Sequence, residues 1–215
     1  TLTLIISAGD SFFAYEHVLN SLQRLGRDSL LTLDLRDVLT QSPRSRGPRL
    51  SIPNYIASLD RIDLSWVLTD AEKETMGDAY LSYDPHDPAC FPSASLLAAS
   101  SLDEAQVACI KLALTTRMSI IQGPPGTGKT YVGVRIVQLL RAILDRSPDD
   151  VSGPILCVCF TYHALDQFLE ALLAVGMTKI ARVGARSKSE ALQELSLHNL
   201  RLRHNNDRGN RDYGR

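Results

Sequence analysis

The most constraining feature of this sequence is the spacing Gly123-x-x-x-x-Gly128-Lys129-Thr130. A short apolar run, 118–122, precedes it and is typical of a strand, and a predicted helix from about residue 129 to 144 follows it. A strand that passes through a glycine-rich loop directly into a helix is a recurring unit of parallel α/β folds. The spacing therefore fixes one strand, one loop and one helix of the fold.

The residues after this unit continue the alternation of strand and helix. The pattern predicts strands over 155–160 and 179–183, and helices over 163–175 and 189–201. The run 155–160 is apolar throughout, as expected for a strand in a parallel sheet that is covered on both faces. Before the loop, Ser101-Leu-Asp-Glu104 resembles a capping box and predicts a helix to about residue 116. The predicted fold class is α/β, with a doubly wound parallel sheet and flanking helices.

The chemistry of the glycine loop is the binding of nucleotide phosphates. Glycines let backbone N–H groups turn toward phosphate oxygens, and the helix N-terminus adds partial positive charge. The predicted nucleotide-binding residues are consecutive: Gly123, Pro124, Pro125, Gly126, Thr127, Gly128, Lys129 and Thr130. Lys129 is expected to reach the β- and γ-phosphates of ATP, and Thr130 to offer its hydroxyl to Mg²⁺.

Hydrolysis also needs an acidic residue at the end of a second strand, and none is evident. Leu102-Asp103-Glu104-Ala105 has the composition of such a box, but it precedes the loop and opens a predicted helix. None of the 85 residues after Thr130 forms an apolar strand that ends in Asp-Glu. We therefore expect the nucleotide cradle without the full catalytic set, and ATP turnover by these residues alone at the background rate.

Composition and prolines predict the organisation of the rest. Residues 1–92 are expected to form an accessory segment with a helix over 11–25, a loop over 41–53 and a proline-rich linker over 84–92. Residues 93–202 are expected to hold the nucleotide-binding domain, and 203–215 a basic, disordered tail. The chain lacks an initiator Met, so its first residue is interpreted as a cut end.

Charge and cysteines bear on partners and compartment. Residues 176–215 carry 9 Lys and Arg against 4 Asp and Glu, whereas residues 1–100 carry 8 against 13. A basic C-terminal segment can meet nucleic-acid phosphates, or it can simply be a solvated tail. The four cysteines form no CxxC pair, which suits a reducing compartment, the cytoplasm or nucleus. No apolar run is long enough to span a membrane, so no membrane partner is expected.

Four segments in order resemble one helicase family. These are Leu102-Asp-Glu-Ala-Gln106, Ile121–Thr130, Cys159–Glu170 and Ile180–Ser189. They resemble superfamily 1 helicases of the up-frameshift type, and most closely the NFX-type zinc-finger helicases, which act in RNA silencing and antiviral RNA sensing. The resemblance implies a RecA-like P-loop NTPase fold, here incomplete, with ATP and Mg²⁺ as cofactors and single-stranded RNA as partner. DNA stays an alternative.

The resemblance also implies roles for individual residues. Gln106 would contact the adenine edge, and Thr161 and nearby backbone amides would contact a sugar-phosphate backbone. The nucleic-acid residues implied by the match are Thr161, Tyr162, His163, Gln167, Arg182 and Arg186. Alternatives stay open: His163 and Asp166 can cap a helix, and Arg182, Arg186 and Lys188 can solvate a loop. A second RecA-like domain, which would supply arginines across the ATP cleft, is expected in the complete protein.

One residue departs from the family pattern. The subfamily usually has Asn where this chain has Tyr162, whose ring can stack on a base or block the groove.

Two other classes of protein remain as alternatives. One is a truncated, non-catalytic remnant that binds ATP and RNA, and the other is a different P-loop ATPase, such as a ring-forming machine, which should show its acidic box soon after the loop.

Overall fold

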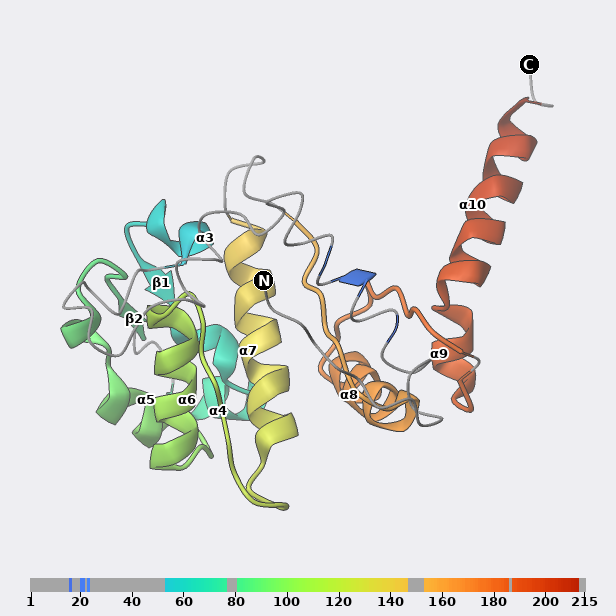
Figure 1. Ribbon diagram of the computed structural model, residues 1–215. Coiled ribbons are helices and arrows are strands. Elements are labelled where there is room, and N and C mark those ends of the chain that lie inside the picture. Colours follow the sequence, from blue (N-terminus) through green and yellow to red (C-terminus); the bar gives the residue numbers. More distant parts are fainter. Residues whose placement is uncertain are drawn as a thin grey trace. The chain divides into compact units, whose positions relative to one another are not determined.

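The computed structural model divides the chain into two units, Thr1–Arg49 and Leu50–Arg215. It describes residues 16, 20, 21 and 23 of the first unit, and residues 53–76, 81–146, 153–185 and 187–212 of the second (Figure 1). The four described residues of the first unit are helical, as predicted for 11–25. The rest of that helix, and the loop predicted over 41–53 except its last residue, lie outside the described residues.

The second unit consists mainly of helices. In chain order the elements are α3 Asn54–Ala57, β1 Ile62–Asp63, the 3-10 helix η1 Leu64–Val67, α4 Asp70–Met76, β2 Ser82–Tyr83, the 3-10 helix η2 Pro88–Cys90, α5 Ser93–Ala99, α6 Glu104–Thr115, α7 Lys129–Leu144, α8 Tyr162–Ala174, α9 Glu190–Glu194 and α10 Leu197–Asp212. Strands β1 and β2 pair antiparallel, with Ile62 opposite Tyr83.

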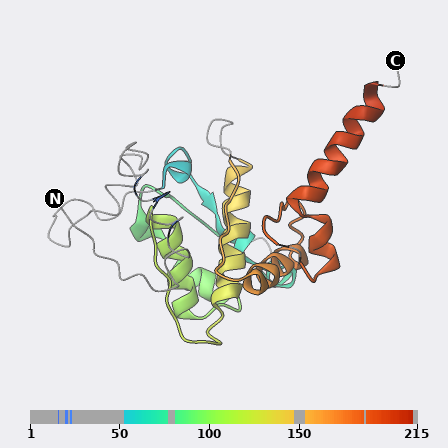
Figure 2. The same cartoon turned by 45° about the vertical axis from the view of Figure 1, so that its right-hand side comes forward.

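Helix α7 lies between two apolar clusters. One stripe of α7, which includes Val132, Leu139 and Ile143, packs into a cluster with η1 and α6. Another stripe, Val134 and Val137, packs against α8 and α9. Figures 1 and 2 both show α7 flanked by α6 and α8. Because its apolar residues recur at helical spacing on two faces, α7 packs against both apolar clusters of the unit.

The accessory segment and the helix after the glycine loop share one core. Its buried residues come from both: Ile56, Ile62, Leu64, Val67, Leu68, Leu81, Tyr83, Phe91, Leu96, Leu102, Val107, Ile110, Leu114, Val132, Leu139 and Ile143. The described parts of residues 53–102 therefore stabilise the position of α7 directly. A domain boundary near residue 92 stays a prediction.

The parallel sheet predicted from the sequence is not confirmed. Within the described ranges, β1–β2 is the one sheet, and the segments 118–122, 155–160 and 179–183 contain no regular strand. Burial nevertheless alternates along each segment: Ile155 and Cys157 are half-buried against the α8 cluster, whereas Leu156 and Val158 are exposed. The segments thus have the period of strands with one covered face, but among the described residues no neighbouring strand forms a parallel ladder with them.

The helix predictions agree well with the structure. The bounds of α7 match the predicted residues 129–144, and α8 begins and ends one residue before its prediction. The predicted helix over 189–201 is instead two helices, because the backbone of Arg182 pairs with the break between them: its N–H donates to Leu195 O at 2.8 Å, and Leu197 N–H donates to its carbonyl at 2.9 Å. Helix α10 continues to Asp212, through most of the segment 203–215 for which a basic, disordered tail is predicted.

Glu72 ties the accessory segment to the start of the region around α6. One oxygen of its carboxylate, Oε2, accepts from Thr69 N–H at 2.7 Å, and the other, Oε1, accepts from Ser101 N–H at 2.6 Å. Its own N–H donates to Thr69 Oγ1 at 3.2 Å, which completes a capping box at α4. Burial raises the pKa of the Glu72 carboxyl, but the hydrogen bonds from Thr69 and Ser101 outweigh it and bring the pKa to about 2.

We expect this carboxylate to stabilise the fold above pH 4 and not below pH 2. Its folded pKa of about 2 lies below the ordinary Glu value of about 4.3, so the contribution is fully present above the unfolded pKa and declines as the pH falls toward the folded one. The measurement is urea unfolding of wild type and Glu72→Gln at several pH values. The difference in unfolding free energy should shrink as the pH falls from about 5 to about 2.5. A difference that stays constant would contradict this role.

Candidate nucleotide and nucleic-acid site

The glycine loop has a backbone that only glycine adopts readily at two positions. Gly126 has φ +83° and Gly128 has φ +74°, both in the left-handed region. At Gly128 a Cβ would also lie 2.7 Å from Gln106 Nε2, and at Gly123 it would lie 2.7 Å from Thr127 Oγ1. The pattern of glycines in the sequence is therefore required by the conformation of the loop.

The loop ends at an open helix N-terminus. Gly128 is the N-cap of α7, and no side chain caps that end. Lys129 Nζ donates to Gly123 O and to Pro124 O, both at 2.7 Å, so the ammonium group lies across the loop. Lys129 and Thr130 are exposed in the first turn. Uncapped N–H groups, a cation and a hydroxyl at one helix end form the donor set that nucleotide phosphates and their Mg²⁺ require.

Gln106 lies beside this loop, although its helix begins differently from the prediction. The predicted capping box, Ser101 with Glu104, is wrong, because the N-cap of α6 is Asp103 and its partner is Gln106. Gln106 N–H donates to Asp103 Oδ1 at 2.8 Å, and Asp103 N–H donates to Gln106 Oε1 at 3.1 Å. The free end of the amide, Nε2, points to Thr127 O at 3.4 Å. The box thus positions Gln106 at the loop, and Asp103 and Glu104 open a helix as predicted.

The predicted nucleic-acid residues of the third segment, Cys159–Glu170, lie at the start of α8. Thr161 is the N-cap, and its Oγ1 accepts from Ala164 N–H at 3.2 Å. Tyr162 is 56% exposed, and His163 and Gln167 are exposed on the following turn. The cap is therefore Thr161 and not His163 or Asp166. Three exposed side chains, Tyr162, His163 and Gln167, therefore lie at this helix end.

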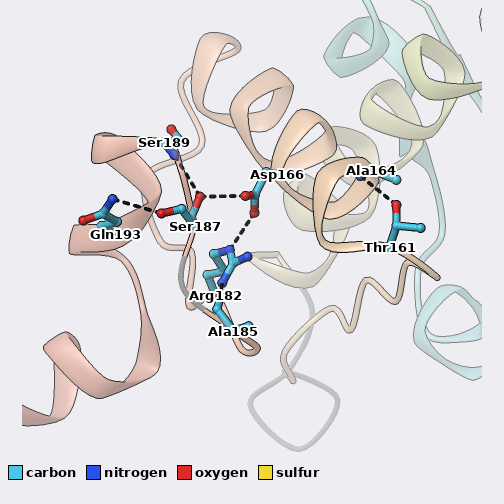
Figure 3. A network of polar contacts seen from close by, with 8 residues as sticks. All are labelled: Thr161, Ala164, Asp166, Arg182, Ala185, Ser187, Ser189 and Gln193. Atoms are coloured by element: carbon cyan, nitrogen blue, oxygen red, sulfur yellow. Dashed lines mark hydrogen bonds and ion pairs between the residues drawn. The ribbon is translucent and has the colours of Figure 1, made fainter.

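Arg182 has a different position, inside a polar network (Figure 3). It is 2% exposed, and its Nε donates to Asp166 Oδ1 at 2.6 Å. Ser187 Oγ donates to Asp166 Oδ2 at 2.6 Å, and Arg182 Nη1 donates to Ala185 O. Burial raises the pKa of the Asp166 carboxyl, but the bonds from Arg182 and Ser187 lower it below its ordinary value. The network joins α8 to the segment before α9.

The ring of Tyr162 lies beside this network. The Arg182 guanidinium lies 5.8 Å from the centroid of that ring. On Gly184, which has φ +137°, a Cβ would come within 2.7 Å of Tyr162 Cε1. One part of the ring thus lies near a buried cation and beside a residue without a side chain.

Sequence reasoning located the loop residues and the start of α8, and it missed the partners of Arg182. No spacing in the sequence joins Asp166, Arg182 and Ser187, and the close approach of Gly184 to Tyr162 leaves no trace in composition. Lys188 is exposed, and Arg186 lies outside the described residues. Among the residues that the structure describes, no group of three or more His, Cys, Asp or Glu side chains could hold a metal ion, and the cysteines are free.

Comparison with known proteins identifies what this arrangement resembles. A family profile described as "AAA domain" matches residues 101–212. No solved structure is significantly similar to the chain. Over the described part of the chain, no helix has the length and hydropathy to cross a membrane.

Three curated relatives show the range of similarity. NFX1-type zinc finger-containing protein 1 of Homo sapiens is 36% identical over 207 residues, 92% of this chain and 10% of that protein. Helicase required for RNAi-mediated heterochromatin assembly 1 of Schizosaccharomyces pombe is 32% identical over 184 residues, covering 86% and 16%. ATP-dependent helicase upf1 of the same yeast is 33% identical over 100 residues, covering 45% and 11%. The chain thus spans about a tenth to a sixth of the length of these relatives.

Proposed function

Because this chain belongs to the AAA domain family and represents the ATP-binding region of a superfamily 1 helicase of the up-frameshift type, we propose that it binds Mg²⁺-ATP at the glycine loop and single-stranded RNA at the start of α8. The observation that carries the proposal is the open N-terminus of α7, with Lys129 across the loop. The complete protein acts in RNA silencing or RNA surveillance, as the names of its relatives suggest.

The loop residues have separate tasks in this proposal. The N–H groups at the start of α7 hold phosphate oxygens, and Lys129 exchanges its two carbonyl partners for the β- and γ-phosphates. Thr130 holds the Mg²⁺ that accompanies ATP and neutralises phosphate charge. Gln106, which the capping box positions at Thr127, receives the adenine edge. In the complete protein, a second RecA-like domain closes on this site and supplies arginine.

The start of α8 binds the strand by backbone contact and stacking. Thr161 and the first N–H groups of α8 contact phosphate and sugar, while the Tyr162 ring stacks on a base. Arg182 acts by positioning: its guanidinium orients the ring through a cation–π contact, while Asp166 neutralises the guanidinium. A stack on a fixed ring tolerates any base, which suits a protein that moves along a strand without reading its sequence.

A binding experiment tests the two sites together. Fluorescent ATP and a labelled oligouridine are titrated separately into the chain, with and without Mg²⁺. We expect both to bind, with ATP affinity dependent on Mg²⁺. Absence of ATP binding would refute the nucleotide site at the glycine loop. If heparin, a polyanion without bases, binds as tightly as the oligouridine, the stacking site is refuted. A deoxyribose strand of the same sequence separates RNA from DNA.

Tyr162→Ala should weaken binding of oligouridine by roughly tenfold, because one base–aromatic stack contributes about 1–3 kcal/mol. Gly184→Ala should have a similar effect, since the new Cβ displaces the ring. Tyr162→Phe keeps the ring and is the matched control. Fluorescence anisotropy of a labelled strand gives the affinities, and ATP affinity should stay unchanged in all three variants. Equal RNA affinity of Tyr162→Ala and Tyr162→Phe would remove stacking from the proposal.

A further inference from the structure

A pocket lies away from the glycine loop, along the later part of α7. It has a volume of about 770 Å³ and is bounded by η1, α4, α7 and the residues after α8 up to Met177. Six of its lining side chains carry the argument: Trp66, Lys73, Arg135, Gln138, Arg141 and Arg146. The volume is in the range of pockets that hold a nucleotide-sized molecule.

The charges of the pocket do not balance. Lys73, Arg135, Arg141 and Arg146 line it together with two carboxylates. Those two carboxylates are already engaged, since Asp70 lies 3.7 Å from Lys73 and Asp145 pairs with Arg141. Within the described ranges, Arg135 and Arg146 have no carboxylate oxygen at ion-pair distance, and Asp145 reaches Arg146 only at longer range. Among the described residues, the pocket therefore keeps two guanidinium groups, those of Arg135 and Arg146, without a paired carboxylate.

Arg135 is the stronger indication of a ligand, because it is 5% exposed. Its Nη1 donates to Gln138 Oε1 at 3.0 Å and its Nη2 to Tyr131 OH at 3.2 Å, both neutral acceptors. Its buried Nε has no hydrogen-bond partner among the described residues. A buried cation without a counter-charge is costly, and a bound anion would supply both the charge and the missing acceptor.

The second uncompensated guanidinium lies on an aromatic ring. Arg146 is 4.8 Å from the centroid of Trp66, and Lys73 is 5.4 Å from it. Trp66 is 38% exposed and borders the pocket, so a ligand that enters it meets a ring that already orients two cations. An arginine that is positioned in this way is a suitable donor for a phosphate, which accepts two parallel N–H bonds.

We propose that this pocket is a second anion site, which binds a phosphate group through Arg135 and Arg146. Two uncompensated guanidinium groups match the charge of a phosphate monoester. The site is separate from the glycine loop, whose cation is Lys129, and it does not depend on the proposed function. The phosphate can come from inorganic phosphate, from a mononucleotide or from the 5′ end of a strand, and these sources share the same chemistry.

The chain offers a direct reporter of this site, because Trp66 is its one tryptophan. The experiment uses all 215 residues with Lys129→Ala, so that the glycine loop no longer contributes. Inorganic phosphate is titrated at constant ionic strength against potassium chloride, and Trp66 fluorescence is recorded. We expect a saturable change with phosphate and none with chloride. A signal that does not saturate, or that chloride reproduces, would overturn the proposal.

Variants assign the signal to the pocket. Arg146→Gln should weaken phosphate binding by roughly tenfold, the loss of one charge-assisted hydrogen-bonded contact, and the exposed Arg201→Gln is the matched control with unchanged binding. Arg135→Gln should abolish phosphate binding, and circular dichroism shows whether this variant is folded. If Arg135→Gln is unfolded, the affinity of Arg146→Gln alone tests the proposal. Unchanged binding in Arg146→Gln overturns the proposal. A 5′-phosphorylated oligonucleotide is then compared with inorganic phosphate and with the same oligonucleotide bearing a 5′-hydroxyl. Tighter binding of the 5′-phosphorylated form than of both assigns the site to a strand end. Binding equal to that of inorganic phosphate assigns the site to small phosphates.

Discussion

Lys129→Ala is expected to weaken ATP binding by roughly 100-fold. The ammonium group of Lys129 is expected to donate two charge-assisted hydrogen bonds to the phosphates, each contributing about 1.5 kcal/mol. In the structure the same two bonds go to Gly123 O and Pro124 O, so Nζ is already held across the loop. Binding of phosphate then exchanges acceptors and needs no large rearrangement of the side chain. The measurement is a titration of fluorescent ATP in the presence of Mg²⁺.

The fold should not change in this variant. Lys129 is exposed and contacts the loop alone in the described part of the chain, so its removal leaves no cavity. We expect the unfolding free energy to stay within about 0.5 kcal/mol of wild type. Lys179→Ala, at another exposed lysine, is the matched control and should keep full ATP affinity. Wild-type affinity of Lys129→Ala would remove the glycine loop as the nucleotide site.

Asp166→Asn is expected to destabilise the second unit by about 3 kcal/mol, the lower end for loss of one partner from a buried ion pair. Asp166 keeps 15% side-chain exposure, whereas Arg182 keeps 1%, so water reaches the carboxylate but not the remaining cation. The variant leaves the guanidinium of Arg182 without a counter-charge. Urea unfolding measures the change in free energy.

A matched surface pair separates burial from pairing. Asp145 and Arg141 form an ion pair of the same kind at the exposed end of α7. Asp145→Asn breaks this surface pair and should leave the unfolding midpoint unchanged. A double variant, Asp166→Leu with Arg182→Met, removes both buried charges and should recover most of the stability. It should not recover RNA affinity, since Tyr162 loses its cation. Equal effects of Asp166→Asn and Asp145→Asn would show that the network of Figure 3 contributes no more than a surface contact.

The apolar segments show where sequence reasoning reached its limit. Burial alternates along residues 155–160 with the period of a strand, yet none of the three predicted strands forms a regular strand in the structure. Whether strands pair into a parallel sheet depends on neighbours at both edges, which hydropathy along one segment does not report. The same limit applies to residues 203–212, where composition predicted a tail and the backbone instead continues α10.

The sequence by itself determined the loop and the helices around it. Gly126 and Gly128 are needed for left-handed backbone, Lys129 and Thr130 follow at a fixed spacing, and α7 has its predicted bounds, because these are local properties of the chain. Only the tertiary structure decided that Asp103 and not Ser101 caps α6, that Arg182 pairs with Asp166, and that residues 53–102 share a core with α7. These contacts join residues that are distant in sequence or compete locally for one partner. Packing decided the pairing of Arg182 with Asp166, since the fold buries the guanidinium and a buried charge is stabilised by a counter-charge beside it.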